Sequence, residues 1–354
     1  GFIRPHMADE NDKRTIYMVD MHEPLMFLHN LETTIKEPFA SNPAVLDAIE
    51  KNHRKLQIAM TKLYPGNLVI SLSSGVMHHR LVDRITALND VPREPLVPRR
   101  LGKNMCVPFG KILRGKVVPN TVTKTLHTDK VYEPDLNSFT IEPFPYYSPL
   151  KSQIETIKSF DRPVILVDDL VHKADRLQVL VPQLREDGIP IRKVVVGVLS
   201  GYGRDLMQCL KVPVESIYSM PNLRQWFVES TLYPFIGGDT VRREEMKVAG
   251  LQPSINMILP YATPKLSGCS REALVEFSAC CIENSRDLLQ VLEAEYRKQY
   301  AKNLTLSRLS EAVILPLCPD KGSCMEYDEN LAASVYLEND LETLWRMKEF
   351  MIKG

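Results

Sequence analysis

The spacing of apolar residues changes along the chain, and each change marks a different kind of structure. Between about residues 18 and 63 the apolar positions recur at helical intervals, and Pro43 suits the first turn of a helix. The recurring positions are Val45, Leu46, Ile49, Leu56 and Met60. We therefore predict a helical lead-in over residues 8–63.

A strand-length pattern begins after this segment. Leu68–Leu72 is a short apolar run that ends at the small residues Ser73, Ser74 and Gly75, and a helical stripe follows over Val76–Leu88. The order of strand, tight turn and helix is half of a βαβ unit. An α/β core is therefore expected to begin near this point.

A second unit of this kind is clearer. A buried-type strand at Pro163–Val167 leads into a polar turn over 168–176, a helix over 177–186 and another strand at Val194–Leu199. Strands joined through a helix in this way lie parallel. We predict an α/β core over residues 64–245, with a mainly parallel sheet flanked by helices.

Helical periodicity returns in the C-terminal part of the chain. Residues 271–302 and 331–352 are long amphipathic stretches. We predict a helical C-terminal section over residues 246–354. The expected fold class is therefore α/β, with N- and C-terminal helical extensions.

Composition limits the partners that the chain can have. Its 44 lysines and arginines balance 44 aspartates and glutamates, so no overall field favours nucleic acid or an anionic membrane. The longest apolar runs fall well short of the roughly 20 residues that cross a bilayer. Seven cysteines without regular spacing indicate reduced thiols rather than a disulfide framework. We interpret residues 1–7 as a cloning remnant and expect a cytoplasmic protein.

Two adjacent carboxylates, Asp168 and Asp169, follow the apolar residues Val164–Val167, and open α/β sheets bind ligands at such strand ends. This segment resembles the phosphoribosyl pyrophosphate (PRPP) signature of the type I phosphoribosyltransferases, and the resemblance covers about residues 68–239. It implies that the two aspartates hold the ribose hydroxyls near Mg²⁺. The alternative is that they only cap the next helix, where side-chain oxygens accept from exposed N–H groups.

The turn after the acidic pair departs from the family. The resemblance implies that this turn binds the 5′-phosphate at the start of a helix. The family turn is rich in threonine and glycine, whereas this one consists of His172, Lys173, Ala174, Asp175 and Arg176. Lys173 and Arg176 could replace the missing contacts with charge, and Asp175 would oppose them.

The first strand-to-helix turn occupies the position of another family loop. Ser73, Ser74 and Gly75 match the loop that receives pyrophosphate, although small residues also suit any tight turn. For the two loops to face one crevice, the strand ends Leu72 and Val167 must lie side by side.

Basic residues gather in one part of this neutral chain. Residues 93–130 contain nine lysines or arginines against two acidic residues. The centre of this stretch resembles in position the mobile loop that closes over pyrophosphate in the family. Lys111, Arg114, Lys116 and Lys124 are therefore candidates for stabilising the departing charge. The alternative is a solvated β-hairpin with charged edges.

Aromatic residues follow where the family often receives its acceptor base. Trp226, Tyr233 and Phe235 are candidates for stacking on that base, and core packing is the alternative for each of them.

These expectations combine into one function and two rivals. We predict transfer of a phosphoribosyl group from PRPP to an unidentified nitrogen nucleophile, with pyrophosphate as the leaving group and Mg²⁺ held by Asp168 and Asp169. The expected partners are a small-molecule donor and acceptor, without nucleic acid or membrane, and family habit implies a homodimer. The rivals are a family-like protein that binds a nucleotide or phosphosugar without turnover, and a structural partner protein.

Overall fold

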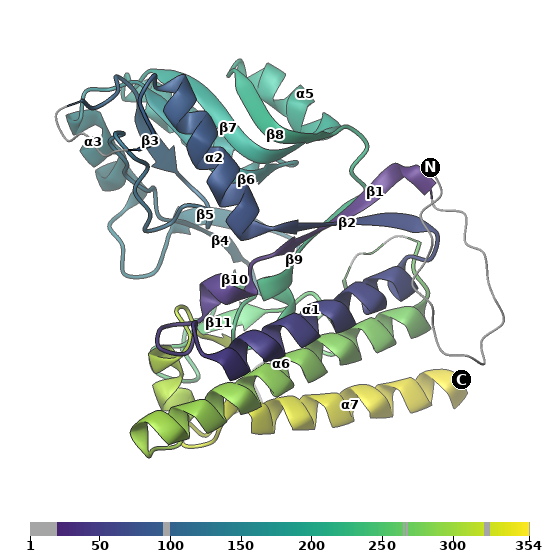
Figure 1. The fold of residues 1–354 in the computed structure, drawn as a ribbon. Helices are drawn as coiled ribbons and strands as arrows, with labels where there is room; N and C mark the ends of the chain where they lie inside the picture. Colours follow the sequence, from purple (N-terminus) through teal and green to yellow (C-terminus); the bar gives the residue numbers. More distant parts are fainter. Residues whose placement is uncertain (1–19, 95–99, 265, 267, 322–325, 354) are drawn as a thin grey trace.

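The computed structural model describes residues 20–353, apart from 95–99, 265, 267 and 322–325. The interpreted cloning remnant and the helical lead-in up to residue 19 lie outside the described residues. Three sheets and a layer of long helices make up the described part of the chain (Figure 1). Among these helices, none is long and apolar enough to cross a membrane.

A parallel sheet of four strands carries the acidic pair. Its strand order is β3-β6-β7-β8, and every neighbouring pair is parallel. The strands are β3 (Met105–Pro108), β6 (Val164–Val171), β7 (Ile191–Ser200) and β8 (Val214–Met220). Helices pack on both faces of the sheet, which explains the continuous apolar runs at Val164–Val167 and Val194–Val196. The predicted class, α/β with parallel strands flanked by helices, is confirmed.

Successive residues of β6 pack in two different clusters. Ile165 and Val167 pack with residues of α2 (Ser74–Leu88), whereas Val164 and Leu166 pack with residues of other helices. Those helices are α3 (Leu150–Ser159), α4 (Asp175–Glu186) and α5 (Gly201–Leu210). The period of two is that of a strand buried on both faces. β6 is therefore a rigid central support for the residues at its carboxyl end.

A second parallel sheet has the order β2-β1-β9. Its strands are β1 (Asp20–His29), β2 (Asn67–Ser73) and β9 (Gln225–Val228). The prediction of a wholly helical lead-in is therefore wrong for residues 20–29. The four residues from Leu25 to Leu28 are all buried, so no period of two marks them as a strand. The helix itself, α1 (Pro43–Leu63), follows the predicted spacing.

The third sheet has the order β12-β11-β10-β4-β5 and mixes parallel with antiparallel pairs. Its strands are β4 (Thr128–Tyr132), β5 (Phe139–Pro143), β10 (Asp239–Val241), β11 (Gln252–Ile255) and β12 (Leu317–Pro319). The C-terminal section was predicted to be helical. Because β11 and β12 lie after residue 246, this prediction is wrong for those two segments.

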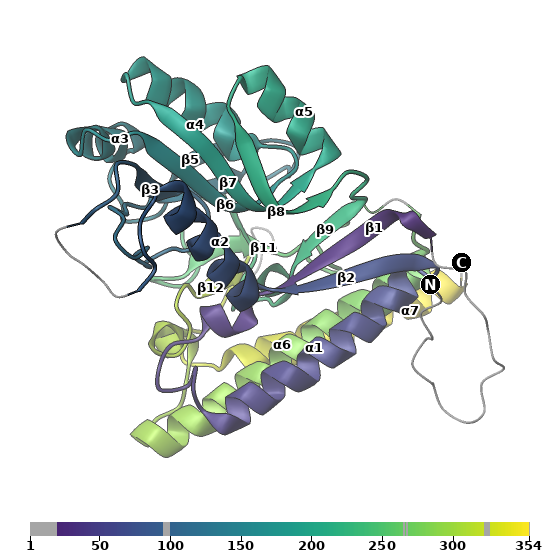
Figure 2. The same ribbon diagram turned by 45° about the horizontal axis from the view of Figure 1, so that its top comes forward.

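Three long helices, α1, α6 (Arg271–Tyr300) and α7 (Ala333–Lys353), run side by side, with α6 contacting both of the others (Figures 1 and 2). They share an apolar core with β1 and β9. Within it, Asn52 of α1 and Asn284 of α6 are buried and exchange hydrogen bonds, each amide donating to the other residue's backbone carbonyl at 2.8 and 3.2 Å. Three short 3₁₀ helices complete the fold: η1 (Leu31–Thr34), η2 (Glu229–Leu232) and η3 (Leu306–Glu311).

Candidate functional site

The acidic pair lies inside β6 rather than in the turn that follows it. The strand continues to Val171, four residues beyond the predicted end, so Asp168 is buried and Asp169 is half-buried. Their carboxylates accept from the backbone N–H groups of Asp169 and Leu170, at 2.8 Å each. α4 begins only at Asp175, and no side chain caps its first turn. The alternative of a helix cap is therefore wrong.

Asp168 is in an environment that disfavours a lone negative charge. Burial and the neighbouring Asp169 raise the pKa of Asp168 well above its ordinary value, and Arg176 opposes this rise. Gly110, two residues after β3, approaches it so closely that a Cβ would meet Oδ1 of Asp168 at 2.1 Å. The carboxyl group thus has little room, and it favours a cationic or hydrogen-bonding ligand beside it.

Two of the predicted cations, Arg114 and Arg176, interact with this carboxyl group, and Lys111 interacts with both arginines. Arg176 acts on Asp168, and Arg114 interacts with both. The pKa of Lys111 is lowered because surrounding protein disfavours the ammonium group, although its side chain still reaches solvent, and Asp239 opposes the effect. The structure therefore brings together residues from the basic stretch and from the turn after β6.

The guanidinium groups at this site have unused hydrogen-bonding capacity. The Nε atoms of Arg114 and Arg176 are buried and have no hydrogen-bond partner among the described residues. The Arg114 guanidinium lies over the ring of Phe144, 4.7 Å from its centre. Burial, followed by repulsion from Arg176, lowers the pKa of Arg114. Two buried donors next to each other favour an anion between or beside them.

Acidic residues from the third sheet complete the cluster. Asp129 of β4 accepts from the hydroxyl of Thr240 at 2.8 Å, and Asp239 begins β10. Burial raises the pKa of Asp239, whereas Lys111 and Lys130 lower it. Sequence analysis counted Asp129 among the two acidic residues of the basic stretch and assigned neither aspartate to the site. Only the pairing of β4 with β10 brings them together.

His127 is another residue that sequence reasoning missed. Its ring stacks on Tyr147, with 3.7 Å between the ring centres, and its Nδ1 atom is buried without a partner among the described residues. Burial, then Arg114 and Lys124, lower the pKa of His127. The imidazole is therefore neutral at physiological pH. The only sequence feature that pointed to His127 was its position within the basic stretch of residues 93–130.

The turn after β6 is held by contacts other than those expected. Asp175 forms an ion pair with Lys130 at 3.0 Å, so it does not face Arg176 as an unpaired charge. His172 shares a hydrogen bond of 2.6 Å with Ser200, and Lys173 is exposed. Ala174 has a left-handed conformation with a φ of 54° immediately before α4.

Ser73, Ser74 and Gly75 do not adjoin the acidic pair through the sheet. Ser73 ends β2 and pairs with His29 of β1, so Leu72 and Val167 lie in different sheets and their predicted adjacency is wrong. β1 takes the place beside β2 that the prediction gave to β6. Ser74 begins α2, and its buried Oγ has no partner among the described residues.

The basic stretch is neither a free loop nor a β-hairpin in its described part. Ile112, Leu113 and Val118 are buried and pack in the core between the parallel sheet and α2. Lys116 and Lys124 remain exposed. The anchoring apolar residues alternate with the basic ones, which made the segment look solvated in the sequence.

Two of the three aromatic candidates pack in the core. Tyr233 and Phe235 are 0% exposed in the cluster that joins β1 to the long helices, and Phe235 contacts Tyr327 and Tyr336. Core packing, the alternative role, therefore applies to Tyr233 and Phe235, and the expectation that they stack on an acceptor base is wrong. Trp226 is half-buried on β9.

Comparisons with known proteins give distant structural similarities. No family model and no curated protein matches the chain. A purine phosphoribosyltransferase from Pyrococcus horikoshii aligns at 13% identity over 44% of this chain and 86% of its own, with a TM-score of 0.26. A hypoxanthine phosphoribosyltransferase from Trypanosoma cruzi aligns at 15% identity over 48% of this chain and 81% of its own, also with a TM-score of 0.26. Scores this low support no conclusion about the function of this chain.

Proposed function

We propose that the chain binds PRPP at the carboxyl end of β6 and transfers its phosphoribosyl group to a nitrogen nucleophile. The observation that carries the proposal is the gathering of Asp168 and Asp169 with Lys111, Arg114 and Arg176. A ribose with several phosphates presents hydroxyl donors for carboxylates and oxygen anions for guanidinium groups. The chemistry of the cluster and that of the ligand are complementary.

The arginines are suited to the phosphates. A buried N–H group without an acceptor is costly, and a phosphate oxygen would satisfy the Nε donors of Arg114 and Arg176 with charge-assisted hydrogen bonds. It would also relieve the mutual repulsion of the two guanidinium groups. Asp129 and Asp239 offset part of the positive charge, which keeps the cluster stable when no anion is bound.

Transfer requires that one bond break and another form at the anomeric carbon of the ribose. The bond from this carbon to the pyrophosphate oxygen breaks, and the bonding electrons leave with pyrophosphate, where Lys111 and Arg114 stabilise the new charge. The lone pair of the nitrogen nucleophile forms the new bond. The nitrogen then loses a proton, and His127, which burial and nearby cations keep neutral by lowering its pKa, is the proposed acceptor.

The acidic pair fits Mg²⁺ in the chemistry of its donor atoms. Carboxylate oxygens are the ligands that Mg²⁺ prefers, and one or two protein carboxylates with substrate oxygens are its usual set. Asp168 and Asp169 would hold the ion, and it would neutralise charge on the phosphates. A cation there would also favour the ionised form of Asp168, which burial and Asp169 oppose.

A second candidate function is binding of a phosphosugar or nucleotide without turnover. The observation that favours it is the position of Ser73–Gly75 at the end of β2, in a different sheet from β6, because this loop then offers no support for pyrophosphate next to Asp168. The remaining cluster could hold one phosphate group and a ribose.

Calorimetric titration of PRPP with excess Mg²⁺ tests the proposed site. Asp168→Asn combined with Asp169→Asn should abolish binding while the protein stays folded. The matched control is Asp161→Asn with Asp205→Asn, which removes the same charge from two exposed positions and should bind like the parent. Unchanged affinity in the first double variant would overturn the site. Binding without pyrophosphate release across a set of purine, pyrimidine and amine acceptors would favour the second function.

A further inference from the structure

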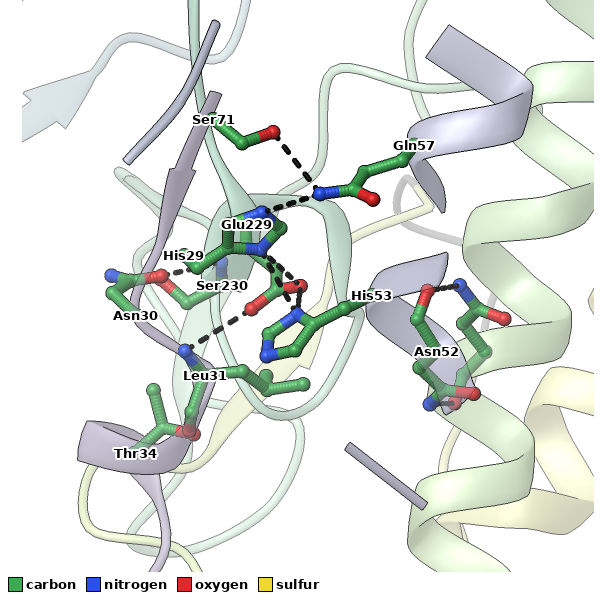
Figure 3. Close-up of polar contacts among 11 residues, drawn as sticks. His29, Asn30, Leu31, Thr34, Asn52, His53, Gln57, Ser71, Glu229 and Ser230 are labelled. Atoms are coloured by element: carbon green, nitrogen blue, oxygen red, sulfur yellow. Dashed lines mark hydrogen bonds and ion pairs between the residues drawn. The ribbon is translucent and has the colours of Figure 1, made fainter. Parts of the chain in front are cut away.

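A carboxylate and two imidazoles meet where the second sheet joins the long helices (Figure 3). His29 ends β1, His53 lies in α1 and Glu229 begins η2. The Glu229 side chain is 0% exposed, and those of His29 and His53 are 13% and 21% exposed. A fully buried carboxylate is unusual in a protein unless it is paired or binds a metal. Nothing in the proposed phosphoribosyl transfer uses these three residues.

The donor atoms of the three side chains converge on one point. The ligand atoms all lie within 4.8 Å of one another. Nδ1 of His29 is 3.0 Å from Nδ1 of His53 and 3.4 Å from Oε2 of Glu229, and His53 also contacts this oxygen. A tetrahedral ion at about 2.0–2.2 Å from each nitrogen or oxygen separates its ligand atoms by roughly 3.3–3.6 Å. The two distances from Nδ1 of His29 are close to this range, whereas the contact between His53 and Glu229 is shorter, so these two side chains would move apart around an ion.

Hydrogen bonding alone satisfies this arrangement poorly. Each neutral imidazole has one N–H and one lone pair, and here both Nδ1 atoms face each other and the same carboxylate oxygen. If both nitrogens donate to Glu229, their two protons point at each other. If one Nδ1 atom carries no proton, that nitrogen cannot form a hydrogen bond to the carboxylate. A single cation at the centre would use all three lone pairs at once.

Surrounding contacts fix the orientation of the ligands. Oε1 of Glu229 accepts from the backbone N–H of Leu31 at 3.3 Å, and Nε2 of His29 lies 3.2 Å from the amide of Gln57. Asn30 and Ser230 exchange two hydrogen bonds of 2.9 Å, which tie the end of β1 to the start of η2 (Figure 3). Partners of this kind are typical around metal ligands, because they hold each ring and carboxylate in place.

The donor atoms of the cluster favour one class of cation. The three side chains offer two imidazole nitrogens and one carboxylate oxygen, and the Glu229 side chain is fully buried. This set suits Zn²⁺ and related ions rather than Mg²⁺ or Ca²⁺, which prefer oxygen ligands.

We propose that His29, His53 and Glu229 bind one divalent transition-metal ion of the zinc type. Three protein ligands leave a fourth tetrahedral position, and the partial exposure of both imidazoles allows water or an added ligand to reach it. This site is independent of PRPP binding, so either proposal can fail without the other.

Titration of the metal-free full chain with Zn²⁺ and with Co²⁺ tests the site. The parent should bind one ion per chain, and the Co²⁺ form should show the visible absorption of a tetrahedral ion with nitrogen and oxygen ligands. His53→Gln and Glu229→Gln should each weaken Zn²⁺ binding at least about a hundredfold. The matched control, His79→Gln, removes an exposed histidine from α2 and should bind like the parent.

Three results would overturn the proposal. One is a parent that binds no Zn²⁺. Another is a folded His53→Gln variant with unchanged affinity, which keeps the test decisive even if Glu229→Gln fails to fold. The third is a sulfur-to-cobalt charge-transfer band, because it would place the ion on the cysteines of the chain instead.

Discussion

Gly110→Ala tests how tightly the acidic site is packed. The φ of Gly110 is not positive, so alanine suits its backbone, but the added Cβ would lie 2.1 Å from Oδ1 and 2.8 Å from Cγ of Asp168. Asp168 is 6% exposed, and its Oδ1 already accepts the N–H of Asp169. The carboxyl group must therefore move by about 1 Å within a packed interior, which costs about 1–3 kcal/mol.

Thermal unfolding and PRPP titration measure the effect. At roughly 2.1 cal/mol/K of unfolding entropy per residue, this cost lowers the Tm of the 354-residue chain by about 1–4 °C. PRPP affinity should fall as well, because the displaced carboxylate is the proposed ribose ligand. The control is Gly75→Ala, whose Cβ would meet only Ser73 Oγ at 3.6 Å and should stabilise α2 by about 0.5–1 kcal/mol. A Gly110→Ala variant with parental Tm and affinity would refute the close approach to Asp168.

Two further substitutions probe charge. Arg176→Gln should weaken PRPP binding by about 1.5–3 kcal/mol, or tenfold or more, and added salt should weaken the parent more than this variant. Calorimetry at low and high salt checks this, with exposed Arg185→Gln on the same helix as control, and equal affinity at low salt would contradict it. Glu229→Gln should lower the free energy of unfolding by about 1.5–3 kcal/mol at neutral pH, because charge-assisted hydrogen bonds are lost. The folded pKa of Glu229 is below 4.5, so its ionisation contributes fully above that pH and is lost as pH falls through the folded value. Urea unfolding should therefore show a difference between parent and variant that shrinks as pH falls below 4.5; a difference that stays unchanged in strong acid would count against the argument.

Part of the charged cluster could be found from the sequence, because local patterns mark some of its residues. An apolar run before Asp168 and Asp169 predicts a buried strand with carboxylates near its end, and clustered charge marks Lys111 and Arg114 in a neutral chain. Local pattern also identifies α1 and the α/β class. The homodimer, the cytoplasmic location, Mg²⁺ and the domain boundaries stay predictions.

The arrangement of the sheets could not be predicted, because it depends on contacts between distant segments. β1 pairs with β9 across about two hundred residues, and no local pattern indicates which strand lies beside β2. The same holds for the metal-type cluster. His29 and His53 are 24 residues apart, and Glu229 is 176 residues beyond His53, so no motif spacing joins them. Single histidines and a single glutamate carry no signal until the fold places them together.

The two reciprocal hydrogen bonds between Asn52 and Asn284 fix the position of α1 along α6. A shift by one turn would leave two buried amides and two buried carbonyls without these hydrogen bonds, so α1 and α6 have one preferred alignment rather than a range. Asn52 immediately precedes His53, so that alignment also sets how far His53 reaches toward Glu229 (Figure 3). The packing of α1 against α6 thereby sets the geometry of the imidazole and carboxylate cluster, and a substitution at Asn284, although remote in sequence, would shift the donor atoms of that cluster.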